Sequence, residues 1–188
     1  MKTKDEIRNE IFELVNKNFM QSPAIRIKAV MDSIGFFDAP ASTKYHGCYP
    51  GGLAEHSLQV AKNLVTLTEK LGLQWEDSRS PFLIGLLHDI CKCDQYKENP
   101  VWTEGSKEPR YVYRNDSIYS HHGEKSICIL ASSGLVLTQE EVTCIRWHMG
   151  AYETDTNEWK YYGNAIAKYP NVLWTHTADM MASHIDGI

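Results

Sequence analysis

The sequence lacks long apolar runs, blocks of basic residues and cysteines at C-x-x-C spacing. No apolar segment approaches the roughly 20 residues that a membrane span needs, and residues 1–6 lead into an amphipathic pattern rather than a signal sequence, so we expect no membrane partner. The formal net charge of −5, with scattered lysines and arginines, gives no electrostatic footprint for duplex DNA. The five cysteines lack C-x-x-C spacing, which is typical of reduced thiols in a cytoplasmic protein.

What the chain does contain is a series of amphipathic helical patterns. Its 188 residues, 43% of them hydrophobic, suit one domain over residues 1–188 with a real core. Apolar spacing predicts helices over residues 5–17, 25–31, 53–71, 80–92, 122–133, 138–148, 157–168 and 171–185. Residues 35–50 read as a loop, and residues 93–120 as a small β-ribbon or a long ordered loop. The predicted fold class is therefore an all-α helical bundle with one small ribbon.

One of these patterns ends abruptly in a metal-ligand type of residue beside a carboxylate, His88-Asp89. Adjacent residues in a helix point about 100° apart, so they can grip one ion only at a distorted or terminating turn. By itself the pair also fits an ordinary polar helix end. The remaining histidines and aspartates of the chain decide between the two interpretations.

Six residues stand out because each lies in an otherwise apolar helical segment, at intervals of about 30 residues. They are His56, His88, Asp89, His122, His148 and Asp179. Such intervals correspond to about one helix plus one connection, and helical bundles build metal sites from the inward side chains of facing helices. A carboxylate on an apolar face is costly unless it is paired or bound to a metal. The pattern therefore predicts a metal centre.

Imidazoles and carboxylates without thiolates suit a divalent transition ion such as Fe, Mn, Ni, Co or Zn, with Mg as a further candidate. Six ligands are enough for one ion or for two ions bridged by a carboxylate, and Asp89 is the predicted bridge and catalytic carboxylate. Lys92, one turn beyond His88, is predicted to act in catalysis and to bind a substrate phosphate. His46 is a candidate substrate contact, with an ordinary loop residue as the alternative.

Four local motifs resemble the HD superfamily of metal-dependent phosphohydrolases. Residues 51–60 look like the GGL-x-EH-(S/T)-L-x-V opening that is seen in HD-type 3′-to-5′ exoribonucleases. Residues 86–92 are similar to LLHDIGK, with Cys91 where glycine is usual. Residues 121–126 resemble GHGExS, and residues 178–183 match AD-x-x-AS. The resemblance covers residues 45–185, which is nearly the whole chain.

This resemblance implies an HD fold in which His56, His88, Asp89 and Asp179 hold the first metal. It also implies that His122 and His148 mark a member able to hold two metals. The expected activity is hydrolysis of a phosphate ester of a small substrate, a nucleotide, by metal-activated water. Two alternatives stay open: an exonuclease or phosphodiesterase acting on short single strands, and a metal-holding sensor without catalysis.

Overall fold

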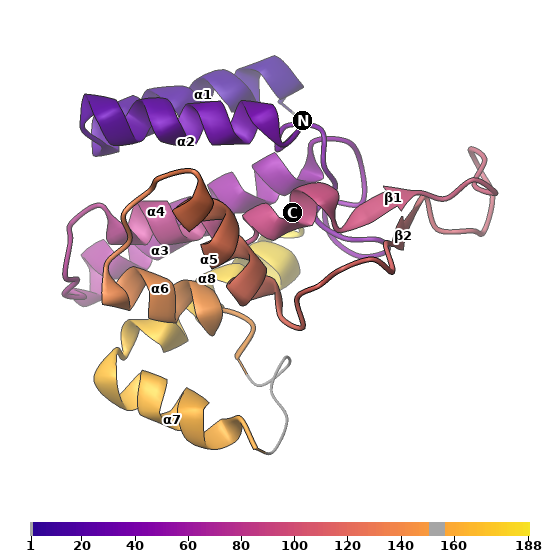
Figure 1. The fold of residues 1–188 in the computed structure, drawn as a ribbon. Coiled ribbons are helices and arrows are strands. Elements are labelled where there is room, and N and C mark those ends of the chain that lie inside the picture. The colour runs from indigo at the N-terminus through magenta and orange to yellow at the C-terminus, as the bar shows by residue number, and fades with distance from the viewer. Residues whose placement is uncertain (1, 151–156) are drawn as a thin grey trace.

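A computed structural model describes residues 2–150 and 157–188 of the chain. Its elements are α1 (Lys4–Asn18), α2 (Gln21–Ser33), α3 (Gly52–Leu71), α4 (Ser80–Leu87), a 3₁₀ helix (Ile90–Asp94), β1 (Tyr96–Glu98), β2 (Tyr111–Tyr113), α5 (His122–Ser132), α6 (Gln139–Arg146), α7 (Trp159–Lys168), α8 (Asn171–Met181) and a π-helical turn (Ala182–Asp186). Helices joined by loops, with one two-stranded ribbon, confirm the predicted fold class (Figure 1).

The N-terminal helices α1 and α2 lie side by side over the central helices (Figure 1). The first helix begins at a capping box, in which the Thr3 side chain accepts from the Glu6 N–H and the Glu6 carboxylate accepts from the Thr3 N–H. Its apolar face buries Ile7, Ile11 and Val15 in the core. This pair of helices covers one side of the core and contains none of the predicted site residues.

The centre of the molecule is α3, which packs most extensively against α4 and next against α8. The contact with α4 is unusually close at Gly85. A Cβ atom built there would lie 2.4 Å from the Cα of Ala61 on α3, so glycine is required at this crossing. Because His56 lies on α3 and His88 follows α4, this crossing sets how near the two histidines come to each other.

The ribbon of β1 and β2 is antiparallel and projects beyond the helices (Figure 1). Tyr96 pairs with Tyr113 across it, and their rings stand edge to face with centroids 5.1 Å apart. The polar segment 93–120, predicted to be a ribbon or an ordered loop, thus contains a short ribbon.

Two predicted helices end at least four residues earlier than expected, and the helix predicted over residues 138–148 ends two residues early, at Arg146. The helix predicted over residues 80–92 stops at Leu87, and Asp89 has φ −107° and ψ 18°, outside the α-helical region, before a 3₁₀ helix follows. The helix predicted over residues 171–185 stops at Met181 and continues as the π-helical turn. Both breaks lie at or next to the predicted site, where π and 3₁₀ distortions commonly gather.

Over residues 2–150 and 157–188, no helix is both long enough and apolar enough to cross a membrane.

Candidate metal centre

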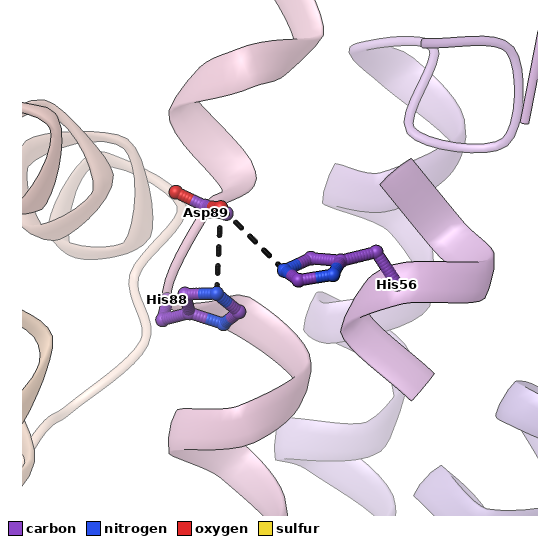
Figure 2. A group of neighbouring side chains, drawn as sticks. All are labelled: His56, His88 and Asp89. Atoms are coloured by element: carbon purple, nitrogen blue, oxygen red, sulfur yellow. Dashed lines mark ion pairs between the residues drawn. The ribbon is translucent and has the colours of Figure 1, made fainter. Parts of the chain in front are cut away.

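Five of the six predicted metal ligands converge in the interior of the helical bundle. His56 comes from α3, His88 and Asp89 follow α4, His148 follows α6, and Asp179 lies on α8. Their donor atoms form two overlapping groups in which all atoms lie within 4.8 Å of one another: His56, His88 and Asp89, and His88, His148 and Asp179. Figure 2 shows the first group, with His56 and His88 both pointing toward the carboxylate of Asp89.

The early end of α4 explains how two adjacent residues reach one centre. His88 is the last residue with α-helical dihedral angles, and the non-helical Asp89 turns its carboxylate back toward the His88 ring. The Asp89 Oδ2 atom lies 3.4 Å from His88 Nε2. In a continuous helix the two side chains would point about 100° apart. The helix ends here instead, which is the terminating turn that two adjacent residues need in order to share one site.

Three imidazoles are oriented by main-chain oxygens in the same way. The Nδ1 atoms of His88 and His148 bond to carbonyls three residues earlier, Gly85 at 2.9 Å and Ile145 at 2.7 Å. These are orphan carbonyls of a last helical turn, which a histidine at a helix C-terminus can satisfy. The Nδ1 atom of His56 lies 2.9 Å from the main-chain oxygen of Ile188. In each ring Nδ1 donates, because a carbonyl oxygen can only accept, and in the neutral imidazole this makes Nε2 the acceptor.

Those three Nε2 atoms are buried and have no hydrogen-bond partner among the described residues. The Oδ1 atom of Asp89 is likewise buried without a hydrogen-bond partner among the described residues. Buried polar atoms are normally satisfied, and a cluster of unsatisfied acceptors indicates a missing cation or donor. Imidazole nitrogens with carboxylate oxygens, lying close together and facing one another, fit a divalent transition metal. These donor atoms therefore fit the divalent transition ion that the sequence predicts.

The two oxygens of Asp89 face different histidines. Oδ2 lies 3.4 Å from His88 Nε2 and 4.0 Å from His56 Nε2, whereas Oδ1 lies 3.3 Å from His148 Nε2. On the other side of His56, Asp179 Oδ1 lies 3.2 Å from Nε2. Asp89 thus stands between two sets of nitrogen donors, which is the placement that a bridging carboxylate needs.

Lys92 is buried against Asp89, with Nζ 2.6 Å from Oδ2. Burial by itself would raise the pKa of Asp89, but Lys92 and the neighbouring histidines hold it well below its usual value. Burial likewise opposes ionisation of Asp179, yet the adjacent His56 and His88 lower the pKa of that carboxyl group. Against its own burial, the pKa of Lys92 is raised by Asp89. Both carboxylates are therefore ionised at neutral pH and Lys92 is protonated.

His46, the predicted substrate contact, lies beside the centre. Its ring centroid is 4.8 Å from that of His56, and its Nε2 atom is 3.4 Å from the Ser183 hydroxyl. Burial, followed by the nearby His56 and Lys92, lowers the pKa of His46 to about 4. This side chain is consequently a neutral imidazole next to the candidate ligands.

His122 is the predicted ligand that the structure does not bring into either group. It begins α5, where Gln95 Nε2 lies 3.1 Å from its Nε2 atom. Together with Gln95 it lines a cavity of about 560 Å³ whose wall also includes Tyr113, Tyr119 and Lys125. Lys125 is paired there with Asp94, and Arg114 with Asp116. The cavity lies between the ribbon and the start of α5.

Sequence reasoning missed several of these features. Gln95 and Tyr113 carry no motif, and only their position on the ribbon segment beside His122 reveals them. The main-chain oxygen of Ile188, which orients His56, has no sequence signal at all. By contrast, the apolar stripe of α3 was enough to single out His56.

Comparison with known proteins adds to this geometry. The sequence profile of the HD domain matches residues 53–174. A curated relative, the dihydroneopterin 2′,3′-cyclic phosphate phosphodiesterase of Methanocaldococcus jannaschii, is 32% identical over 96 residues, which cover 49% of this chain and 36% of the relative. The chain thus spans little more than a third of that relative's length. No solved structure gives a significant match.

Proposed function

The chain belongs to the HD-domain family of metal-dependent phosphohydrolases, and from this premise we propose that it hydrolyses a phosphate ester of a nucleotide. The observation that carries the proposal is the set of buried Nε2 acceptors of His56, His88 and His148, facing the ionised Asp89 and Asp179. A buried arrangement of this kind is costly without a cation, and Lys92 contributes a single positive charge against the two carboxylates.

In this proposal His56, His88, Asp89 and Asp179 hold one divalent transition ion, Fe, Mn, Ni, Co or Zn. His148, which faces the far oxygen of Asp89, would help to hold a second ion together with Asp89 and His122. When bound, such ions lower the pKa of water and neutralise phosphoryl oxygens. Asp89, which its depressed pKa keeps ionised, would orient that water by accepting a hydrogen bond from it.

Lys92, buried beside Asp89, is proposed to act in the same reaction. One of its three N–H donors is directed at Asp89, at 2.6 Å, and we propose that the others reach a phosphate oxygen. In that position it offsets the negative charge that accumulates when a phosphate approaches two carboxylates. His46, neutral and adjacent to His56, is proposed to donate a hydrogen bond to the substrate at the edge of the centre.

The cavity beside His122 supports a nucleotide-sized substrate. Its volume of about 560 Å³ falls within the range of small-molecule pockets. Tyr113, 55% exposed, and Tyr119 offer aromatic surface for a planar ring, and Gln95 offers an amide. The basic residues of the wall are already paired with acidic ones, which favours a short ligand over a long polyanionic strand. The five cysteines, all free thiols, support a reducing, cytoplasmic setting.

A cyclic phosphodiester is the second candidate substrate class, because the archaeal relative is named for acting on one. An exonuclease acting on short single strands is the third. A panel distinguishes them: mononucleotides, 2′,3′-cyclic nucleotides, dihydroneopterin 2′,3′-cyclic phosphate and oligonucleotides, each with Mn²⁺ or Fe²⁺. We expect turnover of mononucleotides to exceed that of oligonucleotides, and to vanish in Asp89→Asn.

The control for this panel is Asp32→Asn, which alters an exposed carboxylate on α2 that belongs to neither the metal centre nor the cavity. Absence of turnover on every substrate by metal-loaded protein would favour the sensor alternative. Activity that survives unchanged in Asp89→Asn would contradict the proposed centre.

A further inference from the structure

We propose that Asn63 and Asp186 form a positioning pair for the candidate metal centre, holding the C-terminal turn so that its main chain orients His56. This inference rests on the proposed metal site but concerns residues that neither bind metal nor touch substrate. It starts from an asymmetry among the three imidazoles. His88 and His148 take their main-chain acceptors from their own helical turns, whereas the acceptor of His56 lies 132 residues away.

A local acceptor is held in place by its helix, but a distant one needs a tether. The Ile188 oxygen is 2.9 Å from His56 Nδ1, and the Ile188 N–H donates to the Ala182 carbonyl at 3.0 Å. Gly187, which lies between Ala182 and Ile188, adopts a left-handed φ of 75°, and this reverses the chain toward His56. The turn itself is exposed at Asp186, so burial alone does not fix its position.

Asn63 provides that tether. It lies on α3 seven residues after His56, on the same face of the helix, and is only 8% exposed. Its Nδ2 atom donates to Asp186 Oδ2 at 2.9 Å and to the Ala178 carbonyl at 3.4 Å. Its Oδ1 atom accepts from Gln59 Nε2 at 3.1 Å. Both amide hydrogens and the amide oxygen are thus engaged, which fixes the side chain in one orientation.

These bonds connect the three segments on which the His56 side of the centre depends. Ala178 precedes Asp179, whose Oδ1 atom lies 3.2 Å from His56 Nε2. Asp186 precedes the turn that presents the Ile188 oxygen. One buried amide therefore ties α3 to α8 and to the C-terminal turn. Groups that orient a metal-binding histidine typically contribute about 10- to 100-fold to metal affinity.

The test uses Asp186→Ala, Asp186→Asn and Asn63→Leu in the full chain. Asp186 is exposed, so its substitution leaves the core intact. Mn²⁺ affinity of the metal-stripped proteins is measured by competition with a fluorescent chelator, and the tautomer of His56 by ¹⁵N NMR. We expect Asp186→Ala and Asn63→Leu to weaken Mn²⁺ binding by about 10-fold and to lose the Nδ1–H tautomer of His56. Asp186→Asn keeps an acceptor oxygen and should retain most of the affinity.

Two controls make the outcomes separable. Glu69→Ala changes an exposed residue of the same helix and should leave affinity unchanged, and His56→Ala should abolish tight binding. Unchanged affinity and tautomer in Asp186→Ala, with binding lost in His56→Ala, would overturn the positioning role alone. A wild-type protein that binds no Mn²⁺ would overturn the proposed function and this inference with it.

Discussion

His88 and His122 were both predicted to bind metal, yet they lie in opposite surroundings. His88 is fully buried just beyond the C-terminal end of α4, and its Nε2 atom has no hydrogen-bond partner among the described residues. His122 is partly exposed at the N-terminal end of α5, with Gln95 beside its Nε2 atom. Helix C-termini favour cations and N-termini favour anions. The helix end at His88 therefore favours a cation, whereas the N-terminal end of α5 at His122 would favour an anion such as the proposed phosphate substrate.

We expect the largest effect from Asp89→Asn, which removes the carboxylate that faces three of the candidate histidine ligands. The amide loses the charge that faces His56, His88 and His148, and it leaves Lys92 buried without its partner. We expect loss of metal and a fall in kcat of more than about 100-fold, beyond the range for residues that only orient ligands.

The same variant should also lose stability, because breaking a buried ion pair costs about 3–5 kcal/mol. Urea unfolding of the metal-free proteins measures this loss, with Asp116→Asn as the matched surface control. Wild-type kcat in Asp89→Asn would show that the interior cluster is not the active centre.

Gly85→Ala should be the next largest effect, because it forces apart the helices that carry His56 and His88. The added methyl would meet Ala61 at 2.4 Å, and overpacking of this kind costs about 1–3 kcal/mol. We expect lower stability together with weaker Mn²⁺ binding. Gly163→Ala on α7, where a methyl meets nothing within 4 Å, is the control and should stabilise slightly. Equal unfolding free energies in the two variants would contradict the close crossing.

His122→Ala tests whether His122 belongs to the same metal site as His88. Because His122 lies outside both groups of close donor atoms, we expect the variant to keep its first equivalent of metal and to lose only the second. Activity should fall by about 10- to 100-fold, less than in Asp89→Asn. Elemental analysis after Mn²⁺ loading checks this outcome. Loss of all bound metal would place His122 functionally inside the interior centre instead.

The smallest effect concerns acid stability at His46. Burial lowers its folded-state pKa to about 4, whereas an unfolded histidine titrates near about 6.5. As the pH falls between these values, the unfolded state binds the additional proton and the folded state loses stability. Urea unfolding of metal-free protein between pH 7 and about pH 4.5 should therefore show a loss that His46→Gln reduces. A loss of the same size in the variant would assign the acid sensitivity to other groups.

Much of the fold followed from helical spacing, and His56 and Asp179 converged because each lies on the buried face of its helix. His88, Asp89 and His148 instead lie just beyond the ends of α4 and α6. His56 stands where a leucine would fit on α3, which marks it as inward-facing. The early end of α4 did not follow, because residues 83–91 contain no proline or other breaker at the point where the helix stops. That break depends on tertiary packing around the His88-Asp89 turn.

The unpredicted part of the site consists of long-range contacts. The pairing of Ile188 with His56, and of Asn63 with Asp186, joins residues that are more than a hundred positions apart. Neither pair has a periodic or compositional signature, since a main-chain oxygen belongs to every residue. The position of His122 beside Gln95 likewise depends on how the ribbon folds back toward α5.

Metal content tests the central claim most directly. The full chain, purified without chelator or stripped and reloaded with Mn²⁺, is desalted and assayed by elemental analysis beside Asp89→Asn. The interior arrangement of His56, His88, Asp89, His148 and Asp179 predicts at least one tightly held divalent transition ion per wild-type chain and far less in the variant. A wild-type chain that retains no stoichiometric metal under either condition would contradict it.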